Sequence, residues 1–245
     1  MHRFYGDEAT LREDTVCLQQ EDAQHCLRVL RLTVGDEAEV YVGGRRYAAK
    51  LLSADGSDVT MQLLSEKPST EPKTKITLFQ GLPKGDKMEL IIQKAVEIGV
   101  TEIVPVEMTR SVVRLSGKDG EKKRERWQKI AREATKQSAR AITPTVCTPV
   151  KLKDAMAMVA KDTLSLVAWE EEHTRSLTQI HEAYSDVRNI AIWIGPEGGI
   201  DEKEIAQLMA ETSAQCVTLG PRILRTETAG LVMLANLLCL WGDMA

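Results

Sequence analysis

The sequence predicts an α/β protein with a small β-rich domain at residues 1–70 and a larger domain of alternating strands and helices at residues 75–245. Before residue 65, short runs of β-forming residues repeat with Gly-Gly and Asp-Gly turns between them. From Lys75 onward, short apolar runs alternate with longer segments whose apolar residues recur at helical spacing. Ser65–Thr74 holds two prolines and no apolar residue, so we expect it to be a linker.

The first domain is expected to fold as a small β-barrel. Gly43-Gly44 and Asp55-Gly56 supply the tight turns that hairpins require. One short helix, Glu21–Leu30, interrupts the strands. The expected strands are Ala38–Val42, Arg46–Leu52 and Val59–Leu64.

The second domain consists of repeated strand-then-helix units, which favour a parallel sheet covered by helices on both faces. The expected strands are Ile76–Gly81, Glu102–Val106, Leu164–Trp169, Ile190–Ile194 and Gln215–Leu219. The expected helices are Lys87–Ile98, which ends at Gly99, then Glu121–Arg140, Asp201–Glu211 and a C-terminal helix that begins near Thr226. Asp201 and Glu204 have the spacing of a capping box.

The composition indicates a globular protein without metal, disulfide or membrane chemistry. The five cysteines form no CxxC pair, so they are expected to be reduced thiols of a cytoplasmic protein. The N-terminal residues MHRFYGDEAT lack the apolar stretch of a signal peptide. The longest apolar run, Ala229–Trp241, is too short to span a bilayer and is expected to be a buried helix.

The charge is unevenly distributed along the chain. The net charge is −4, yet residues 110–140 hold eleven Lys/Arg against four Asp/Glu, a net of +7. A concentrated basic stretch in an acidic chain is typical of a nucleic-acid contact. The alternative is a solvated helix face with ion pairs between neighbouring turns.

Two glycine-bearing loops follow strands at the edge of the sheet where ligands of α/β folds bind. Gly195-Pro196-Glu197-Gly198-Gly199 leaves the backbone bare to a planar ligand, the alternative being a tight strand-to-helix turn. Gly220–Ala229 leads into the apolar C-terminal helix, and Arg225 and Glu227 at its start are either functional or a structural pair. No GxGxxG or GxxxxGK[ST] motif occurs, which argues against ordinary dinucleotide and nucleoside triphosphate sites. A third loop, Glu170–His173, is expected to be solvated surface.

These motifs resemble the RsmE family, the 16S rRNA uridine N3-methyltransferases of the SPOUT superfamily. The resemblance rests first on Gly195–Gly199 followed by Glu204, and on Leu219–Ala229 (LGPRILRTETA). It extends over nearly the whole chain, in order. The further matching stretches are His2–Tyr5, His25–Arg31, Gly35-Asp36, Lys84–Met88 through Lys94, Glu97–Val100, Arg110–Val112, and Glu133 with Gln137, Ser138 and Arg140. This sequence has Cys26 where the family often has a second histidine.

The resemblance implies a PUA-like RNA-binding barrel followed by a SPOUT domain whose end is tucked through a loop as a trefoil knot. It implies S-adenosyl-L-methionine as cofactor and a homodimer whose cofactor sites lie near the subunit interface. The implied substrate is ribosomal RNA, in the small subunit, and the implied product is a uridine methylated at N3, at position 1498 in conventional numbering.

The same resemblance, together with the bare glycine backbone, gives a candidate site. Arg225 is the candidate for stabilising the uridine anion, and Glu197 or Glu227 for taking the proton, although a carboxylate is a weak base for that task. The expected cofactor-binding residues are Ala168, Trp169, Gly195, Pro196, Glu197, Gly198, Gly199, Leu219, Gly220, Ile223, Leu224, Arg225, Thr228 and Ala229.

The basic residues fit two RNA-contact surfaces. The +7 stretch is expected to track phosphates with Arg110, Arg114, Lys122, Lys123, Arg124, Arg132 and Arg140. The barrel is expected to add Arg3, His25, Arg28 and Arg31.

Three other functions remain open from the residues alone. A non-catalytic RNA-binding module needs the basic stretch but no glycine loops. A small-molecule transferase of another α/β class leaves the basic stretch and the barrel unexplained. A SPOUT enzyme with a different target, such as a ribose hydroxyl of transfer RNA, differs only in its substrate.

Overall fold

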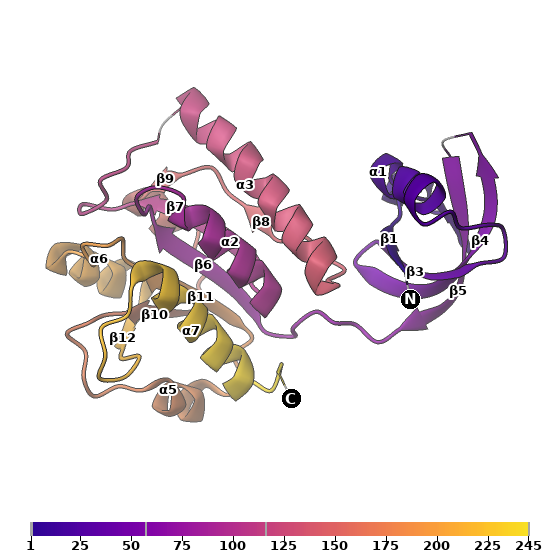
Figure 1. Ribbon diagram of the computed structural model, residues 1–245. Helices are drawn as coiled ribbons and strands as arrows, with labels where there is room; N and C mark the ends of the chain where they lie inside the picture. The colour runs from indigo at the N-terminus through magenta and orange to yellow at the C-terminus, as the bar shows by residue number, and fades with distance from the viewer. Residues whose placement is uncertain (1, 57, 116, 245) are drawn as a thin grey trace. The chain divides into compact units, whose positions relative to one another are not determined.

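The computed structural model describes residues 2–56, 58–115 and 117–244, and the chain forms two compact units (Figure 1). The first unit comprises Met1–Glu71 together with the short segment Ala139–Ile142. The second comprises Pro72–Ser138 and Thr143–Ala245. The first unit therefore differs from the predicted range 1–70 chiefly because it also includes four residues from the middle of the chain, Ala139–Ile142.

The first unit is a five-stranded sheet in the order β1-β3-β4-β5-β2, antiparallel except for the β1–β3 pair. Gly6, just after β1, bridges Leu18, just after β2, so the two edge strands meet and the sheet closes on itself as a small barrel. Phe4, Val40 and Met61 fill its interior. The strands are β1 (Arg3–Tyr5), β2 (Thr15–Cys17), β3 (Glu37–Val42), β4 (Arg45–Asp55) and β5 (Asp58–Lys67), and a short 3₁₀ turn, η1 (Glu8–Thr10), lies between β1 and β2.

Two details of this unit correct the sequence-based expectation. β5 runs to Lys67, so the first residues of the predicted linker Ser65–Thr74 belong to a strand paired with β4. The predicted helix Glu21–Leu30 is α1 (Gln20–Gln24) followed by a π-helical turn, η2 (His25–Val29). Such π turns arise where side-chain packing shifts the hydrogen-bond register, which residue periodicity does not reveal.

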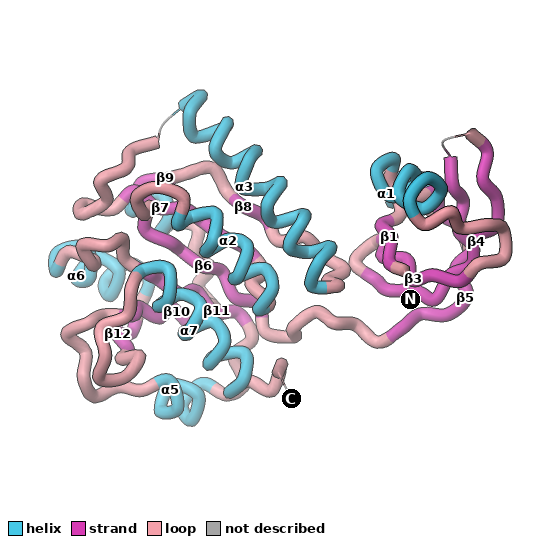
Figure 2. The backbone as a smooth tube through the Cα atoms, in the orientation of Figure 1, coloured by secondary structure: helices cyan, strands magenta, loops and turns pink. Residues whose placement is uncertain are grey.

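The second unit is a parallel sheet in the order β12-β10-β11-β6-β7-β8, with β9 also paired to β7. Helices cover both of its faces, as predicted (Figure 2). The strands are β6 (Lys75–Gly81), β7 (Glu102–Glu107), β8 (Thr145–Val146), β9 (Val150–Lys151), β10 (Leu164–Ala168), β11 (Asn189–Ile194) and β12 (Gln215–Val217). The helices are α2 (Lys87–Ile98), α3 (Gly117–Ser138), α4 (Leu152–Ala157), α5 (Leu177–Tyr184), α6 (Glu202–Thr212) and α7 (Thr226–Leu240).

Alternation along the central strand β6 distributes side chains to two cores. Ile76 and Leu78 lie in the core formed with α2, α3, α5 and α7. Phe79 points to the other face, where it stacks on Trp193 of β11 with ring centroids 4.0 Å apart, in the core formed with α4 and α6. A strand buried on both faces is apolar throughout, which is why these strands were recognisable from sequence.

Helix boundaries agree with the sequence where local signals exist. Asp201 caps α6 and forms the predicted capping box with Glu204, and Gly99 ends α2 with φ +129°. α3 begins four residues earlier than predicted and ends at Ser138, where Ala139 takes φ +59°. Arg140 therefore lies outside the helix in which it was predicted.

Within the described residues, no helix is long and apolar enough to cross a bilayer. The same residues contain no cluster of three His, Cys, Asp or Glu side chains with the geometry of a metal site.

Candidate active site

A cavity of about 580 Å³ lies at the carboxyl ends of β10, β11 and β12 in the second unit. This volume is in the range of small-molecule and cofactor sites. These three strands are neighbours in the sheet, so the loops that follow them converge at its carboxyl edge, where α/β sheets bind ligands. The lining residues come from three loops and the start of two helices: Lys87, Ala168, Trp169, Glu170, His173, Ile194 to Glu197, Gly199, Ile200, Thr218 to Thr226 and Ala229.

The loop after β11 is packed so closely that Gly195 has no room for a side chain. A Cβ on Gly195 would lie 2.8 Å from the carbonyl carbon of Gly199. A Cβ on Gly81, at the end of β6, would lie 2.6 Å from both the Cδ and the backbone nitrogen of Pro196. Gly199 has φ +72°, which other residues adopt at a cost. The Gly195–Gly199 loop therefore presents its backbone to the cavity with little room for rearrangement.

A buried hydrogen-bond chain ties this loop to the start of α7. The Thr226 hydroxyl donates to the carbonyl oxygen of Gly195 over 2.6 Å and accepts from Gln80 Nε2 over 2.8 Å. Gln80 is fully buried at the end of β6 and also donates to the carbonyl of Gly81. These hydrogen bonds therefore fix the Gly195–Gly199 loop relative to the start of α7, where the second glycine-bearing loop ends.

Lys87 connects the two carboxylates that the sequence singled out. Its ammonium lies 2.9 Å from Glu197 Oε1 and 3.4 Å from Glu227 Oε2. Burial raises the pKa of Glu197, but hydrogen bonds from Lys87 and from the Lys84 amide lower it more, so that pKa lies below its usual value. The hydrogen bond to Glu197 raises the pKa of Lys87. Glu197 is therefore ionised and Lys87 charged at neutral pH.

The loop after β7 supports the cavity from outside. Glu204, which is buried, accepts hydrogen bonds from the backbone nitrogen and the hydroxyl of Thr109. The Arg110 guanidinium donates to the carbonyl of Gly198 over 3.0 Å and lies 3.4 Å from an Asp201 carboxylate oxygen. These contacts fasten the Gly195–Gly199 loop and the start of α6 to the segment after β7.

The structure brings together nearly all of the predicted cofactor-binding residues, since every one except Gly198 and Thr228 lines the cavity. Gly198 faces Arg110 instead, and Thr228 is exposed one residue beyond Glu227. Arg225 lines the cavity as an exposed residue just before α7, with backbone rather than side-chain capping contacts. Glu197 also lines the cavity. Glu227 does not line it, but its carboxylate pairs with Lys87, which does.

Several residues that line or support the cavity had no assigned role in the sequence analysis. Lys87 lies in a stretch that resembles the family, but no local signal places it beside Glu197, 110 residues later. Gln80 and Thr226 have the residue types of ordinary strand and helix ends. Glu170 and His173, which were expected to be solvated surface, are exposed, and both also line the cavity, which the sequence analysis did not foresee. The tertiary fold, rather than the local pattern, brings that loop to the cavity.

The basic residues fall into groups with different environments. Lys122 and Arg132 are exposed on α3, and Lys123 and Arg124 are half-buried there, with Arg124 paired to Glu121 over 3.0 Å. Arg114 donates to the carbonyls of Met108 and Thr109, so its guanidinium helps to build the loop after β7. In the first unit, His25, Arg28 and Arg31 are exposed, and Arg3 lies 3.7 Å from Glu39.

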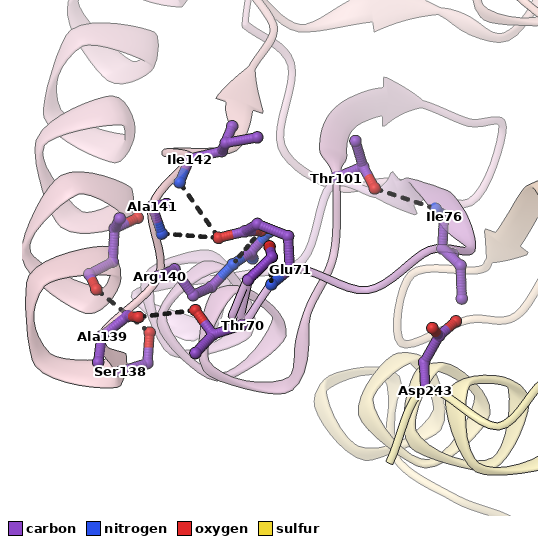
Figure 3. A network of polar contacts seen from close by, with 12 residues as sticks. Thr70, Glu71, Ile76, Thr101, Ser138, Ala139, Arg140, Ala141, Ile142 and Asp243 are labelled. Atoms are coloured by element: carbon purple, nitrogen blue, oxygen red, sulfur yellow. Dashed lines mark hydrogen bonds and ion pairs between the residues drawn. The ribbon is translucent and has the colours of Figure 1, made fainter. Parts of the chain in front are cut away.

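Arg140 was assigned to the phosphate track, and its environment does not support that role. Its side chain is 6% exposed, and its Nη2 lies 2.7 Å from Glu71 Oε2 (Figure 3). The other Glu71 oxygen accepts the backbone N–H groups of Ala141 and Ile142, and the Tyr5 hydroxyl donates to the carbonyl of Arg140. A buried, fully engaged guanidinium fixes the segment Ala139–Ile142 to the first unit.

The fold and the cavity are those of an RNA methyltransferase, and two family models match the chain one after the other. The model of the RNA methyltransferase PUA domain matches residues 18–64, and that of the RNA methyltransferase domain matches residues 70–238. The chain belongs to the family of the ribosomal RNA small subunit methyltransferase E proteins. It is 35% identical over 228 residues to the member from Bacillus subtilis, covering 90% of this chain and 88% of that protein.

Solved structures agree with this assignment. The crystal structure of a ribosomal RNA small subunit methyltransferase E from Neisseria gonorrhoeae bound to S-adenosyl methionine is 33% identical, with a TM-score of 0.80 over 98% of both chains. A putative methyltransferase from Legionella pneumophila, in complex with the same cofactor, is 27% identical, with a TM-score of 0.78 over 97% of this chain and 96% of that one.

Proposed function

We propose that this protein methylates N3 of a uridine in small-subunit ribosomal RNA, at position 1498 in conventional numbering, with S-adenosyl-L-methionine as methyl donor. The observation that carries the proposal is the cavity whose walls are the two glycine-bearing loops. Family membership supports the RNA substrate, and the resemblance described above supports N3 of uridine as the atom modified. The proposed place of action is the cytoplasm, where ribosomal RNA is found.

The residues of the cavity fit this cofactor. Backbone groups of Gly195–Gly199 and Leu219–Ala229 would hold its adenosine and methionine portions, since both loops line the cavity and glycine leaves the backbone accessible. Apolar lining from Ile194, Leu219 and Leu224 suits the purine ring. When bound, the cofactor supplies a methyl group on a positively charged sulfur.

The protein's own part in the chemistry is to orient and expose the base. Uridine N3 carries a proton and is normally engaged in pairing, so the nucleotide must be turned out of its stack before it reacts. The exposed guanidinium of Arg225 at the cavity is placed to stabilise negative charge on the base. Glu197, which is ionised, is placed to receive the proton.

We propose two RNA-contact surfaces, one on each unit. On the second unit, the surface is on α3, with the exposed Lys122 and Arg132 and the half-buried Lys123 and Arg124. On the first unit, it consists of Arg3, His25, Arg28 and Arg31. Arg110 and Arg114 belong to the supports of the cavity, and phosphate contacts are secondary for them.

A homodimer is proposed from the character of α7. This helix is largely apolar, and its side away from the core carries the half-buried Val232 and Ala235, with Asn236 and Cys239 exposed. A helix whose apolar residues extend beyond its core-facing side is normally covered by another element. A second copy of the chain covering this face accounts for the pattern, and it agrees with the dimer that the resemblance implies.

Isothermal titration calorimetry with S-adenosyl-L-methionine tests the cofactor part of the proposal. The wild-type protein is expected to bind one equivalent per chain, and Gly81→Ala, which displaces Pro196, is expected to bind at least about tenfold more weakly. Binding of the cofactor with no loss in Gly81→Ala would place the ligand elsewhere. No binding by the wild type would favour a non-catalytic RNA-binding module.

A further inference from the structure

Lys87 lies at the cavity between two carboxylates contributed by distant parts of the chain. It is the first residue of α2, whereas Glu197 follows β11 and Glu227 lies in the first turn of α7. Its ammonium lies 2.9 Å from Glu197 Oε1 and 3.4 Å from Glu227 Oε2. Lys87 and Glu197 both line the cavity, so an adjacent donor and acceptor face the space where the reaction is proposed to occur.

The cluster of Lys87, Glu197 and Glu227 is not a balanced ion pair, because it has two carboxylates and one ammonium. Two carboxylates share one ammonium, which leaves a net charge of −1 beside the cavity. The Glu227 side chain is 16% exposed, and its Oε2 is buried without a hydrogen-bond partner among the described residues, with the Lys87 ammonium 3.4 Å away. Burying a carboxylate with so little compensation is costly, and such costs are typical of functional sites. Glu197, by contrast, is fixed from a second side by the Lys84 amide.

We propose that Lys87 is a catalytic residue of the methyl transfer: it holds Glu197 as the acceptor of the uridine N3 proton and donates an N–H to the neighbouring carbonyl oxygen of the same base. This inference rests on the proposed function. An ammonium has three N–H bonds. Within the described part of the chain, Lys87 Nζ contacts two carboxylates, so one N–H remains for a ligand.

The pair also matches the edge of the base that reacts. Uracil places the N3–H donor directly beside the O4 acceptor, and enzymes that turn out a base read it by hydrogen bonds to this edge. Glu197 offers an acceptor for N3–H, and Lys87 offers a donor for O4. Cytosine has the opposite pattern at these two positions, so the pair selects uridine.

The step balances with these two side chains. The N3–H bond breaks and its proton passes to a carboxylate oxygen of Glu197. The electron pair left on N3 forms the new bond to the methyl carbon, and the pair of the old carbon–sulfur bond stays on sulfur. Charge that spreads onto O4 is stabilised by the Lys87 ammonium, which makes a weak base sufficient. Glu197 then releases the proton to water.

The ionisation of Glu197 depends on the groups around it. From α2 it receives the Lys87 ammonium and from the preceding loop the Lys84 amide, while Glu227 faces the same ammonium from α7. Arg225, Arg222, His173 and Glu170 line the remainder of the cavity. If Lys87 loses its charge, Glu197 and Glu227 are left as close carboxylates without their shared cation, and a proton is retained to higher pH.

The experiment compares the full-length wild type with Lys87→Met, Lys87→Arg and Lys94→Met, the last being a lysine on the same helix that pairs with Glu97. Methylation of small-subunit RNA is measured from about pH 5 to about pH 9, and cofactor affinity is measured by calorimetry. We expect Lys87→Met to lower kcat/KM about 100-fold and to move the acid limb up by about one pH unit. Cofactor affinity should stay within about threefold, Lys87→Arg should regain at least about tenfold in rate, and Lys94→Met should match the wild type.

Two results would overturn the inference. Lys87→Met could keep the wild-type rate and pH profile, or it could lose cofactor binding in proportion to activity, which would make Lys87 a structural part of the pocket. Should Lys87→Met fail to fold, the same readouts on Lys87→Gln, a neutral side chain, decide the question. A wild-type protein that leaves uridine unmodified would instead refute the proposed function, which distinguishes the two failures.

Discussion

The hydroxyl of Thr226 donates a 2.6 Å hydrogen bond to the carbonyl oxygen of Gly195, joining the first residue of α7 to the loop after β11. Thr226 is buried, and Gln80 Nε2 donates to the same hydroxyl from the end of β6. Three segments that are far apart in sequence are therefore locked together at one oxygen atom beneath the cavity. The shape of the proposed cofactor cavity depends on this lock.

Thr226→Val is expected to weaken that lock while keeping the shape of the side chain. The change removes the donor to the Gly195 carbonyl and leaves the Gln80 amide with the Gly81 carbonyl as its acceptor, which costs about 1–3 kcal/mol in the free energy of unfolding. Denaturant titration measures this loss, and calorimetry should show weaker cofactor binding. The matched control is Thr178→Val, at an exposed threonine near the start of α5, which should leave both unchanged. Equal effects at the two positions would contradict the lock.

Gly81→Ala is expected to damage the site by steric displacement alone. Its new Cβ would lie 2.6 Å from Pro196, and φ at Gly81 is not positive, so the backbone conformation itself suits alanine. The control is Gly120→Ala in α3, where the nearest atom lies 3.5 Å away and alanine favours the helix by up to about 1 kcal/mol. Thermal unfolding should show Gly81→Ala destabilised and Gly120→Ala not. A Gly81→Ala protein of wild-type stability would mean that Pro196 moves freely.

Asp243 gives the stability of the second unit an acid-sensitive component. Burial raises its pKa, but hydrogen bonds from Thr74 and Lys73 lower it more, so it lies below the ordinary value of 3.8. Because the pKa of Asp243 is lower in the folded protein, its ionised carboxylate stabilises the fold. This stabilisation is complete above pH 3.8 and is lost as the pH falls from 3.8 through the folded-state pKa. Asp243→Asn should therefore be less stable than wild type at neutral pH, and this difference should shrink in acid. Urea unfolding at several pH values checks this, with the exposed Asp162→Asn as control.

Charge reversal on α3 is expected to flatten the salt dependence of RNA binding. Each phosphate contact contributes about 0.7–0.9 to the slope of log affinity against log salt. Lys122→Glu, Lys123→Glu and Arg124→Glu together should lower the slope by about 2, whereas reversing the exposed Lys153 and Lys161 should not. Filter binding over a range of salt concentrations provides the measurement. An unchanged slope in the triple variant would reject the α3 surface.

The outward face of α7 provides a test of the dimer. Val232→Glu places a charge on the half-buried apolar side of that helix. If a second copy covers this face, the charge should convert the dimer to a monomer in analytical ultracentrifugation, because burying an unpaired carboxylate is strongly unfavourable. Glu202→Gln, at an exposed position on α6, serves as control. A wild-type protein that is already monomeric would contradict the proposal.

The sequence predicted those parts of the fold that depend on local pattern. Apolar strands such as Ile190–Ile194, the Gly99 helix end and the Asp201–Glu204 capping box are each encoded within a few residues. The glycine loop of the site was visible for the same reason. Its role in close packing is a tertiary property, because Gly81 and Pro196 meet only when β6 and β11 pair.

The remaining errors share a cause. Arg140 was counted as a free positive charge because nothing near it in sequence shows that Glu71, 69 residues earlier, would bury and pair it. No role was assigned to Lys87 because its partners lie in the loop after β11 and on α7, far away in sequence. Charge counts describe composition, whereas the partners of a charge are set by chain topology.

The cavity between the two glycine-bearing loops is proposed to hold a methyl donor beside one uridine of small-subunit RNA. Incubation of the purified protein with unmodified small-subunit RNA and isotopically labelled S-adenosyl-L-methionine, followed by mass spectrometry, identifies the labelled nucleoside and its position. We expect a single label, on N3 of the uridine at the proposed position. A label on a ribose, on another base or nowhere in the RNA would contradict it.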